Sequence, residues 1–419
     1  MDKRARRINI VQNIAILFLS VSALLLFRQT AFPEQYTVSG SISSFLQHYT
    51  PAAESAPDQT PLGSPVFLIR TNALPGGAAL SSDPALESAV AFLHEALQSA
   101  QTPVSVAESE LLSLLNTAGL YMDFGTALPD GLLRLWLNVP SAALPGSVRR
   151  CFLIPGDTVT VYFQSEDGKS YRSTTAADGR FLADHCEANE SGVFFTAAAD
   201  VYGSVSPYTL ISEVAPHRVS LSASAPLSES DFAALLSAAE FNPHTQDRYS
   251  ESSGTVVVLE GQRSLRLQPD GTVTYSGGSA QANSLYLVSA DTRADCAEAA
   301  VAAQTLLGAL TRGRLGAAAL YLSAATATSD GWLLLFDYAV DGTPVRFADG
   351  THAAEITVSD GSITAFTLHC RRYVKTDAVE TLLPVTLAAA VCRAYPDSEL
   401  SVAYVDSYAD TVSADWIAG

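Results

Sequence analysis

Hydrophobic and polar positions follow two different periods along this chain. Between residues 82 and 100, Leu86, Val90, Leu93 and Leu97 recur at the three-to-four-residue spacing of an amphipathic helix. Around Asp360, the segments AAEITV and SITAFTLH instead alternate apolar and polar residues, as half-buried strands do. The sequence therefore predicts both amphipathic helices and antiparallel strands.

The same two patterns extend over most of the chain. Helices are predicted over 82–100, 107–116, 227–241, 291–313 and 377–395, with Pro384 as the true start of the last one. Strands are predicted over 66–70, 132–139, 151–164, 169–174, 192–201, 253–277, 332–373, 401–407 and 411–417. A helix followed by strands thus recurs at least twice. This order indicates an α+β fold, with two or three units of antiparallel sheet and helices packed on one face.

Eight Asp-Gly pairs occur in the sequence, three of them between Asp337 and Phe366. A calcium loop of the D-x-[DN]-x-[DN]-G type needs oxygen ligands at alternating positions, and these three pairs lack acidic residues at the required offsets. Asp-Gly also favours type I′ hairpin turns, in which both central residues take positive φ. We therefore expect sheet corners here, and the sequence predicts no metal site and no cofactor.

The N-terminal segment predicts a membrane anchor. Basic residues at positions 3, 4, 6 and 7 precede an apolar run from Ile8 to Phe27, about the length of a helix that crosses a bilayer. Basic residues concentrate on the cytoplasmic side of such spans, so we expect a cytoplasmic N-terminus and an extracytoplasmic chain from about residue 30. A cleavable signal peptide is the alternative, but no good small-x-small cleavage site follows the apolar run.

Composition narrows the classes of function. A net charge of −19 and a pI near 4.6 argue against a nucleic-acid partner, because phosphates require a basic face. With 48% hydrophobic residues, the 419-residue chain can build ordinary cores. The five cysteines lie far apart without a C-x-x-C, which favours buried free thiols, with a Cys151–Cys186 disulfide as the alternative.

These features divide the chain into five segments. Residues 1–31 form the cytoplasmic tip and the single transmembrane anchor, and residues 32–64 form a stalk rich in Ser, Pro, Thr and Ala. Residues 65–215 are expected to form a first α+β ectodomain, 216–288 a middle unit of helix plus strands, and 289–419 a C-terminal α+β domain.

Signatures of catalysis are missing where they would be expected. The sequence contains no G-x-S-x-G, H-E-x-x-H, Walker or S-x-x-K motif. A pair of converging carboxylates, as in glycosidases, stays open, because nothing in the sequence says which acids would meet. We expect a protein that is not an enzyme.

Four stretches together resemble a known family. They are GTVVVLEGQRSLRLQPDGTVTY, the segment from WLLLFDYAV to FTLHCRRY, LLPVTLAAAV, and LSVAYVDSYADTVSADWI. With the anchor before them, they are similar to the YycH/YycI group of membrane-anchored regulatory proteins of Gram-positive bacteria. The likeness covers the anchor and the chain from about Val219 onward best.

The resemblance implies a partner and a mode of action. Proteins of this group sit beside an essential sensor histidine kinase that controls cell-wall metabolism (the WalK, or YycG, kinase) and modulate its activity. Contact runs through transmembrane helices and extracytoplasmic domains, and the C-terminal parts look like PepSY modules, a helix across a small antiparallel sheet. A second YycH/YycI-type protein is a further expected partner. The group has no catalytic residues to carry over.

One helical face of the anchor is the expected partner-binding site. It consists of Ile10, Ile14, Leu17, Val21 and Leu24. The alternative is that these side chains face lipid only. Two other functions stay open: a PepSY-like binding or protease-inhibitor module, and an extracytoplasmic cell-wall hydrolase.

Overall fold

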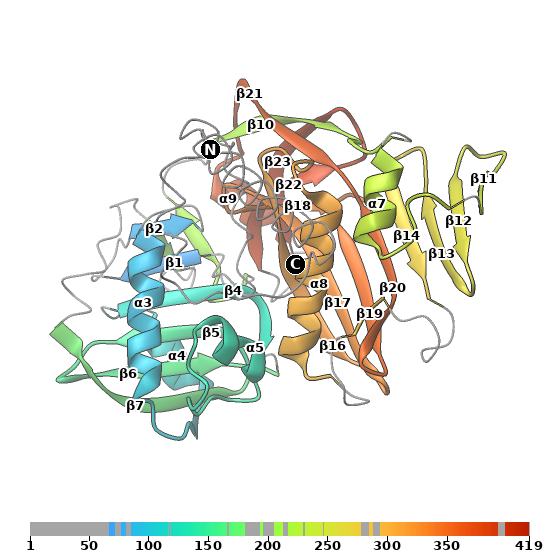
Figure 1. The fold of residues 1–419 in the computed structure, drawn as a ribbon. Helices are drawn as coiled ribbons and strands as arrows, with labels where there is room; N and C mark the ends of the chain where they lie inside the picture. Colours follow the sequence, from blue (N-terminus) through green and yellow to red (C-terminus); the bar gives the residue numbers. More distant parts are fainter. Residues whose placement is uncertain are drawn as a thin grey trace, which may run out of the picture. The chain divides into compact units, whose positions relative to one another are not determined.

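The structure is a computed structural model that describes most of the chain from residue 67 onward. The described residues are 67–71, 77–80, 85–115, 117, 119–165, 167–180, 193–195, 205–212, 217–228, 231–245, 247–277, 285–287, 294–392 and 399–418. All of them belong to one compact unit, residues 57–419. Within this unit two large sheets carry helices on their faces (Figure 1).

The first sheet has seven strands in the order β2-β1-β4-β5-β6-β7-β3, all antiparallel. The strands are β1 (Phe67–Thr71), β2 (Gly77–Leu80), β3 (Val104–Val106), β4 (Gly119–Pro129), β5 (Ser147–Ile154), β6 (Thr158–Gln164) and β7 (Ser170–Asp178). Helices α3 (Ala85–Gln98), α4 (Glu108–Leu114) and α5 (Asp130–Trp136) interrupt them along the chain.

Both faces of this sheet are buried, and the alternation of side chains explains how. On β5, Cys151 and Leu153 pack in the main core with Phe92 and Leu93 of α3. Phe152, which points to the opposite face, packs in a second core with residues of α4. The second core also includes Phe195 of β8 (Val193–Phe195), which pairs with β9 (Leu210–Ser212). The sheet is therefore the middle layer of a three-layer arrangement.

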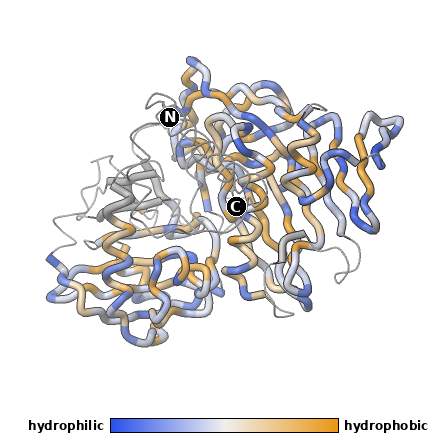
Figure 2. Tube along the Cα trace, in the orientation of Figure 1, coloured by the Kyte–Doolittle hydropathy of each residue, from blue (hydrophilic) through white to orange (hydrophobic). Residues whose placement is uncertain are grey.

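The second sheet has fourteen strands. Its main path runs β11-β12-β13-β14-β20-β19-β17-β18-β22-β23-β10-β21, with β15 paired to β20 and β16 paired to β17. The strands are β10 (His217–Ser224), β11 (Arg248–Ser250), β12 (Val256–Glu260), β13 (Arg263–Leu267), β14 (Thr272–Ser276), β15 (Leu285–Leu287), β16 (Ala318–Ala327), β17 (Gly331–Val340), β18 (Thr343–Phe347), β19 (Ala354–Ser359), β20 (Ser362–His369), β21 (Arg372–Thr381), β22 (Leu400–Asp406) and β23 (Thr411–Ala418). Figure 2 shows hydrophobic positions along these strands and α8, with hydrophilic positions at the outer turns of β11–β13.

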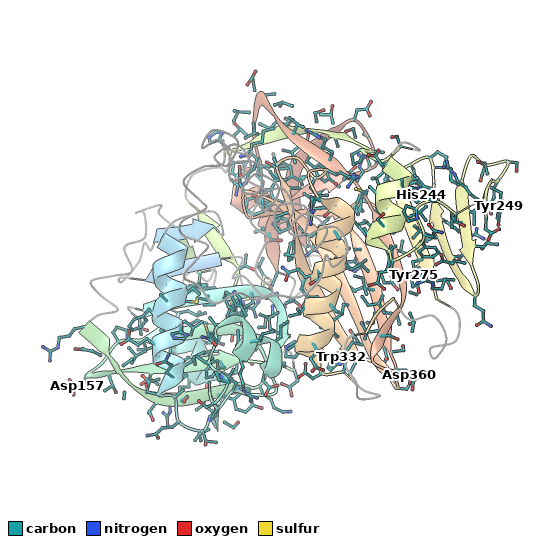
Figure 3. All side chains as sticks on the ribbon, viewed as in Figure 1. Asp157, His244, Tyr249, Tyr275, Trp332 and Asp360 are labelled. Carbon is teal, nitrogen blue, oxygen red and sulfur yellow. The ribbon has the colours of Figure 1, made fainter. Side chains whose placement is uncertain are left out.

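Two helix-plus-strand units meet in the middle of this sheet. Helix α7 (Phe232–Ala238) precedes β11 to β14, and helix α8 (Cys296–Thr311) precedes β16, β17, β19 and β20. Because β14 pairs antiparallel with β20, the strand order of one unit mirrors that of the other. The two helices contact each other, and Tyr275 of β14, labelled in Figure 3, stacks on Phe366 of β20 at 5.5 Å between ring centroids. The predicted recurrence of a helix followed by antiparallel strands is confirmed.

The remaining strands bring the chain back toward β16. Strand β18 pairs in parallel with β22, and β10 lies between β23 and β21. At the start of β21, Tyr373 forms a bridge with Gly316, just before β16, and Ala317 N donates to Tyr373 O at 2.8 Å. Backbone hydrogen bonds of Tyr373 thus join the last strand of the path to the segment that leads into β16.

Sheet corners account for the three Asp-Gly pairs between Asp337 and Phe366, as predicted. At the β17–β18 hairpin Asp341 and Gly342 have φ of 48° and 73°, and at the β19–β20 hairpin Asp360 and Gly361 have φ of 50° and 72°. Positive φ at both central residues is the geometry of a type I′ turn. Figure 3 labels Asp360 at this hairpin tip. The third pair is also a turn, since Gly350 N donates to Phe347 O at 3.0 Å, but it connects β18 to β19, which both pair with β17.

Two predicted elements have the wrong type. The segment 132–139, predicted as a strand, lies largely in helix α5, which Asp130 stabilises through Gly131 N (2.8 Å) and an i,i+4 ion pair with Arg134 (2.6 Å). The helix predicted over 377–395 is instead the end of β21 followed by α9 (Val385–Cys392). Pro384 cannot continue a helix from its N-terminal side, so it marks the start of α9, as expected.

Strand β16 has no counterpart among the predicted elements, because its alanine-rich sequence has low strand propensity. It forms through pairing along the whole of β17. The expected anchor and stalk, residues 1–64, lie outside the described residues. Among the helices that the structure describes, none is long and apolar enough to cross a membrane.

We expect Gly316→Ala to destabilise the fold through the bridge to Tyr373. Gly316 has a φ of 71°, and an added Cβ would collide with the carbonyl oxygen of Tyr373. The loss in free energy of unfolding should be about 3 kcal/mol, from left-handed strain plus the clash. Gly313→Ala is the matched control, since its φ is 69° and nothing lies within 4 Å of its added Cβ. It should lose only about 1 kcal/mol. Equal losses in urea unfolding followed by circular dichroism would contradict this prediction.

Candidate functional site

A buried arginine on β5 connects the two sheets. Arg150 is 4% exposed, and its Nε donates to Asp123 Oδ2 at 3.0 Å and its Nη1 to Gln164 Oε1 at 2.7 Å. Its Nη2 donates to Glu399, which directly precedes β22 of the fourteen-stranded sheet, and Arg149 donates to the same carboxylate. We call Arg150, Asp123, Gln164 and Glu399 the Arg150 cluster.

Two tyrosines complete the surroundings of the Arg150 cluster. The ring of Tyr208 faces the guanidinium carbon of Arg150 at 4.6 Å, a cation–π contact. Tyr121 donates its hydroxyl to Asp123 Oδ2 at 3.1 Å. Burial, followed by the Asp123 charge, raises the pKa of Tyr121 well above its usual value, so this phenol stays a neutral donor. The cluster is a satisfied ionic connection between sheets.

A second buried ion pair lies inside the fourteen-stranded sheet. Asp406, at the end of β22, is fully buried and accepts from Arg371 Nε at 3.0 Å and from the Tyr373 hydroxyl at 2.8 Å. Its other oxygen accepts from Arg371 Nη2 at 3.1 Å and from Tyr408 N at 2.7 Å. The bidentate geometry holds the β20–β21 corner against the β22–β23 corner.

A third group contains a titratable histidine. Asp337 of β17 is buried, with one oxygen bonded to Arg346 of β18 and the other 2.9 Å from Nδ1 of His352. The hydrogen bond to Asp337 raises the pKa of His352, and burial opposes that shift. Arg346 lowers this pKa through its charge, whereas Glu355 raises it.

These groups do not resemble the machinery of a hydrolase. Asp123 and Glu399, two carboxylates that share one network, both bind the Arg150 guanidinium, which occupies the place where a glycosidase would need its substrate. Burial raises the pKa of the Cys296 and Cys370 thiols to about 12, which suppresses the nucleophilic thiolate. Among the residues described, no group of three or more His, Cys, Asp or Glu could hold a metal ion.

Exposed apolar side chains gather along one stretch of chain, from β21 into α9. Val374 and Val379 of β21 are 48% and 65% exposed, and Leu383 and Leu387 are 57% and 56% exposed. The inner side of α9 packs Ala388 and Ala389 in a small core with Leu400. Helix α9 therefore has apolar residues on its buried side and on its outer side, which is typical of a helix that contacts a partner.

The structure places the predicted partner-binding residues outside its described ranges. Ile10, Ile14, Leu17, Val21 and Leu24 all fall there. Sequence reasoning missed the leucines of the α9 surface, which we define as Leu383 and Leu387. A signal was present, since LLPVTLAAAV is apolar at nearly every position instead of on one face.

Comparison with protein-family models, curated protein sequences and solved structures finds no significant match for this chain. The resemblance to the YycH/YycI group therefore remains a hypothesis.

We expect Glu399→Gln to destabilise the protein by leaving Arg150 with a weaker set of acceptors. Arg150 is buried and keeps Asp123, so the loss should be about 2 kcal/mol in free energy of unfolding. Asp167→Asn is the control, because the Asp167–Lys169 pair is 49% and 65% exposed, and stability should not change measurably. Urea titration of both variants checks the difference, and a Glu399→Gln curve that overlays the parent would contradict it.

The His352–Asp337 contact should make stability depend on pH. Because the folded-state pKa of His352 is raised, its contribution is complete below the unfolded value of about 6.5 and disappears as pH rises through the raised pKa. His352→Gln should therefore lose at most about 1 kcal/mol near pH 5.5 and nothing near pH 9. Unfolding curves of parent and variant at both pH values measure this. A gap that widens toward high pH would have the wrong sign.

Proposed function

We propose that this chain is a membrane-anchored extracytoplasmic regulator that acts through protein contacts and not through catalysis. Its partner would be a sensor histidine kinase that controls cell-wall metabolism, in the same membrane. The observation that carries the proposal is the α9 surface, where Leu383 and Leu387 stay more than half exposed beside the small core of Ala388, Ala389 and Leu400.

Three further features support the proposal. The sequence supplies an N-terminal apolar run of bilayer length behind four basic residues, which fits a single anchor with a cytoplasmic N-terminus. The repeated unit of a helix on an antiparallel sheet agrees with the PepSY-like modules that the YycH/YycI resemblance implies. The buried acids of the Arg150 cluster and the Asp406 pair are engaged by internal donors, as structural ion pairs are.

Physically, the regulator would act by a population shift. A partner that binds one conformation of the kinase better than another moves the equilibrium by its difference in affinity. The two contact regions would be the anchor face, Ile10 to Leu24, and the α9 surface. Neither region requires a reaction.

The main alternative is an extracytoplasmic binding or protease-inhibitor module. From Val374 to Thr381, no described strand pairs with the second edge of β21, which favours this function because extended peptides add to free sheet edges. The two functions differ in what is recovered with the protein: a kinase in one case, and a protease or wall-processing enzyme in the other.

We expect Leu383→Glu/Leu387→Glu to reduce recovery of the kinase at least tenfold in a gentle-detergent pull-down from native membranes. Two charges on the contact surface would leave buried, unpaired carboxylates in the complex. Leu135→Glu is the matched control, since Leu135 is a 51% exposed leucine on α5, and recovery should be unchanged.

A second arm replaces the span, residues 8–27, with an unrelated transmembrane helix. Loss of the kinase in this arm would assign part of the contact to the anchor. If the parent protein recovers no kinase, the proposal is wrong, and recovery of a protease instead would support the binding module.

A further inference from the structure

The second edge of β21 is open over most of its length. Strand β21 ends the sheet path, with β10 on one side. On its other side, the described residues provide only the bridge from Gly316 and the bonds of Leu315 and Ala317 to Tyr373. From Val374 to Thr381 no strand of the described chain pairs with this edge. An open edge presents unpaired N–H and C=O groups to any strand of matching sequence.

The charges of β21 match those of a second β21 running in the opposite direction. The strand reads RYVKTDAVET, with Arg372 and Lys375 before its centre and Asp377 and Glu380 after it. If two copies pair about a twofold axis at Thr376, Lys375 of each copy lies opposite Asp377 of the other. Pairing would end before Arg372, because Gly316 already occupies the edge beside Tyr373. We propose that β21 is the docking edge for a second copy of this chain, with Thr376 on the axis.

Neighbouring registers lack this match. Moving the axis by half a residue toward the C-terminus leaves every charged residue of β21 opposite a neutral one. Moving it by half a residue the other way does the same for all but Glu380, which would lie opposite the buried Arg371. Moving it by a full residue places Lys375 against its own copy, or Asp377 against its own copy. Like charges directly opposite one another destabilise a pair, so the sequence specifies a single antiparallel register.

Two of these charged side chains also have contacts within their own copy. Lys375 Nζ lies 2.5 Å from Asp341 Oδ2, and Glu380 Oε1 accepts from Ser220 Oγ at 2.7 Å. Lys375 and Asp341 are 44% and 54% exposed, so their ion pair contributes little and leaves the ammonium free to take a second acceptor. The internal contacts are therefore compatible with pairing across the twofold axis.

Local charge also favours a second copy at this edge. The whole chain carries −19, so two copies repel each other over most of their surfaces. Between residues 372 and 392 the two basic side chains, Arg372 and Lys375, balance the two acidic ones, Asp377 and Glu380. This neutral stretch is where two acidic molecules can approach closely. The exposed Val374 would face Ala378 of the other copy.

A bulge at the centre of β21 restricts what can pair with it. Ser220 of β10 faces three residues of β21, Thr376 to Ala378, because the register shifts between Val219 and Leu221. Thr376 Oγ1 donates to Ser220 O at 2.9 Å and fixes this bulge. Bulges increase local twist and discourage flat, unlimited pairing. A twofold pair uses the same edge of each copy and closes on itself, so it does not propagate.

Disulfide cross-linking of the full-length protein tests the register. Thr376→Cys places the new thiol opposite its own copy, within the Cα separation that a disulfide needs, about 4.4–6.8 Å. Arg372→Cys is the control, because residue 372 would lie eight positions from its copy, about 27 Å along the strands. Under mild oxidation we expect Thr376→Cys to form a species of twice the chain mass, and Arg372→Cys to stay at the parent background.

A second test adds charge substitutions to the Thr376→Cys protein, so that the register is not judged from the cysteine alone. Asp377→Lys alone places the introduced lysine against Lys375 of the other copy, and Lys375→Asp alone places the introduced aspartate against Asp377. Each of these variants should therefore form at least tenfold less disulfide-linked dimer than Thr376→Cys alone. When the two variants are co-expressed with different tags, every charge in the mixed pair regains an opposite partner. The mixed species should return to at least half of the Thr376→Cys level.

Several outcomes would overturn the inference. They are equal linking of Thr376→Cys and Arg372→Cys, a linked partner whose mass is not that of this chain, and a mixed pair that links no better than either variant alone. Circular dichroism of each variant confirms that it is folded. The inference does not depend on the regulatory function proposed above, since it concerns only copies of this chain.

Discussion

The antiparallel pairing of β14 with β20 is the interaction on which the larger sheet depends. Each helix-plus-strand unit has one buried face and would otherwise end in an open edge. Five cross-strand pairs, from Thr272–His369 to Ser276–Ala365, join the units, and the Tyr275–Phe366 stack adds aromatic contact on the helix side. The β14–β20 pairing places α7 beside α8, and the apolar residues of the two units form one continuous core.

The ionic contacts of Arg150 act between the two sheets, whereas the β14–β20 pairing acts within one of them. Burying Arg150 requires that all of its charge be compensated, and the compensation comes from both sheets, through Asp123 on one and Glu399 beside the other. Such a pair contributes little net stability compared with apolar packing, but it penalises any arrangement in which the sheets separate. Glu399 and α9 lie on either side of residues 393–398, so a partner held by Leu383 and Leu387 would act close in sequence to this connection.

Much of the fold could be predicted from the sequence, because periodicity is a local property. The helices around 90, 235 and 303, the hairpins at Asp341 and Asp360, and the two closing strands are all present. The errors arose where tertiary contact decides. LLRLWLNV fits a strand or a helix, and only the Asp130 contacts fix it as α5. The segment DAVET carries helix-compatible residues, but it pairs with β10 as a strand. One contact between the two, from Ser220 to Glu380, spans 160 residues of the chain.

The candidate surface was harder to predict than the fold. An apolar stretch such as LLPVTLAAAV reads as core, and exposure of Leu387 becomes visible only when Ala388 and Ala389 occupy the inner side. The partner of Arg150 was also unpredictable, since Arg149 and Arg150 are separated from Glu399 by about 250 residues. Such pairs have no local pattern, because their partners are determined by how the two sheets meet.

The position of β10 has a consequence for how the chain is made. This strand lies between β23 and β21, yet it is synthesised well before either of them. Until the last strands emerge, its alternating apolar residues have no sheet to join, and contacts of such long sequence separation form slowly. A newly made chain would therefore pass through a stage in which everything up to α8 is present but β21 and β23, the two neighbours of β10, are not. Chaperones and proteases would meet β10 without its sheet partners in that interval.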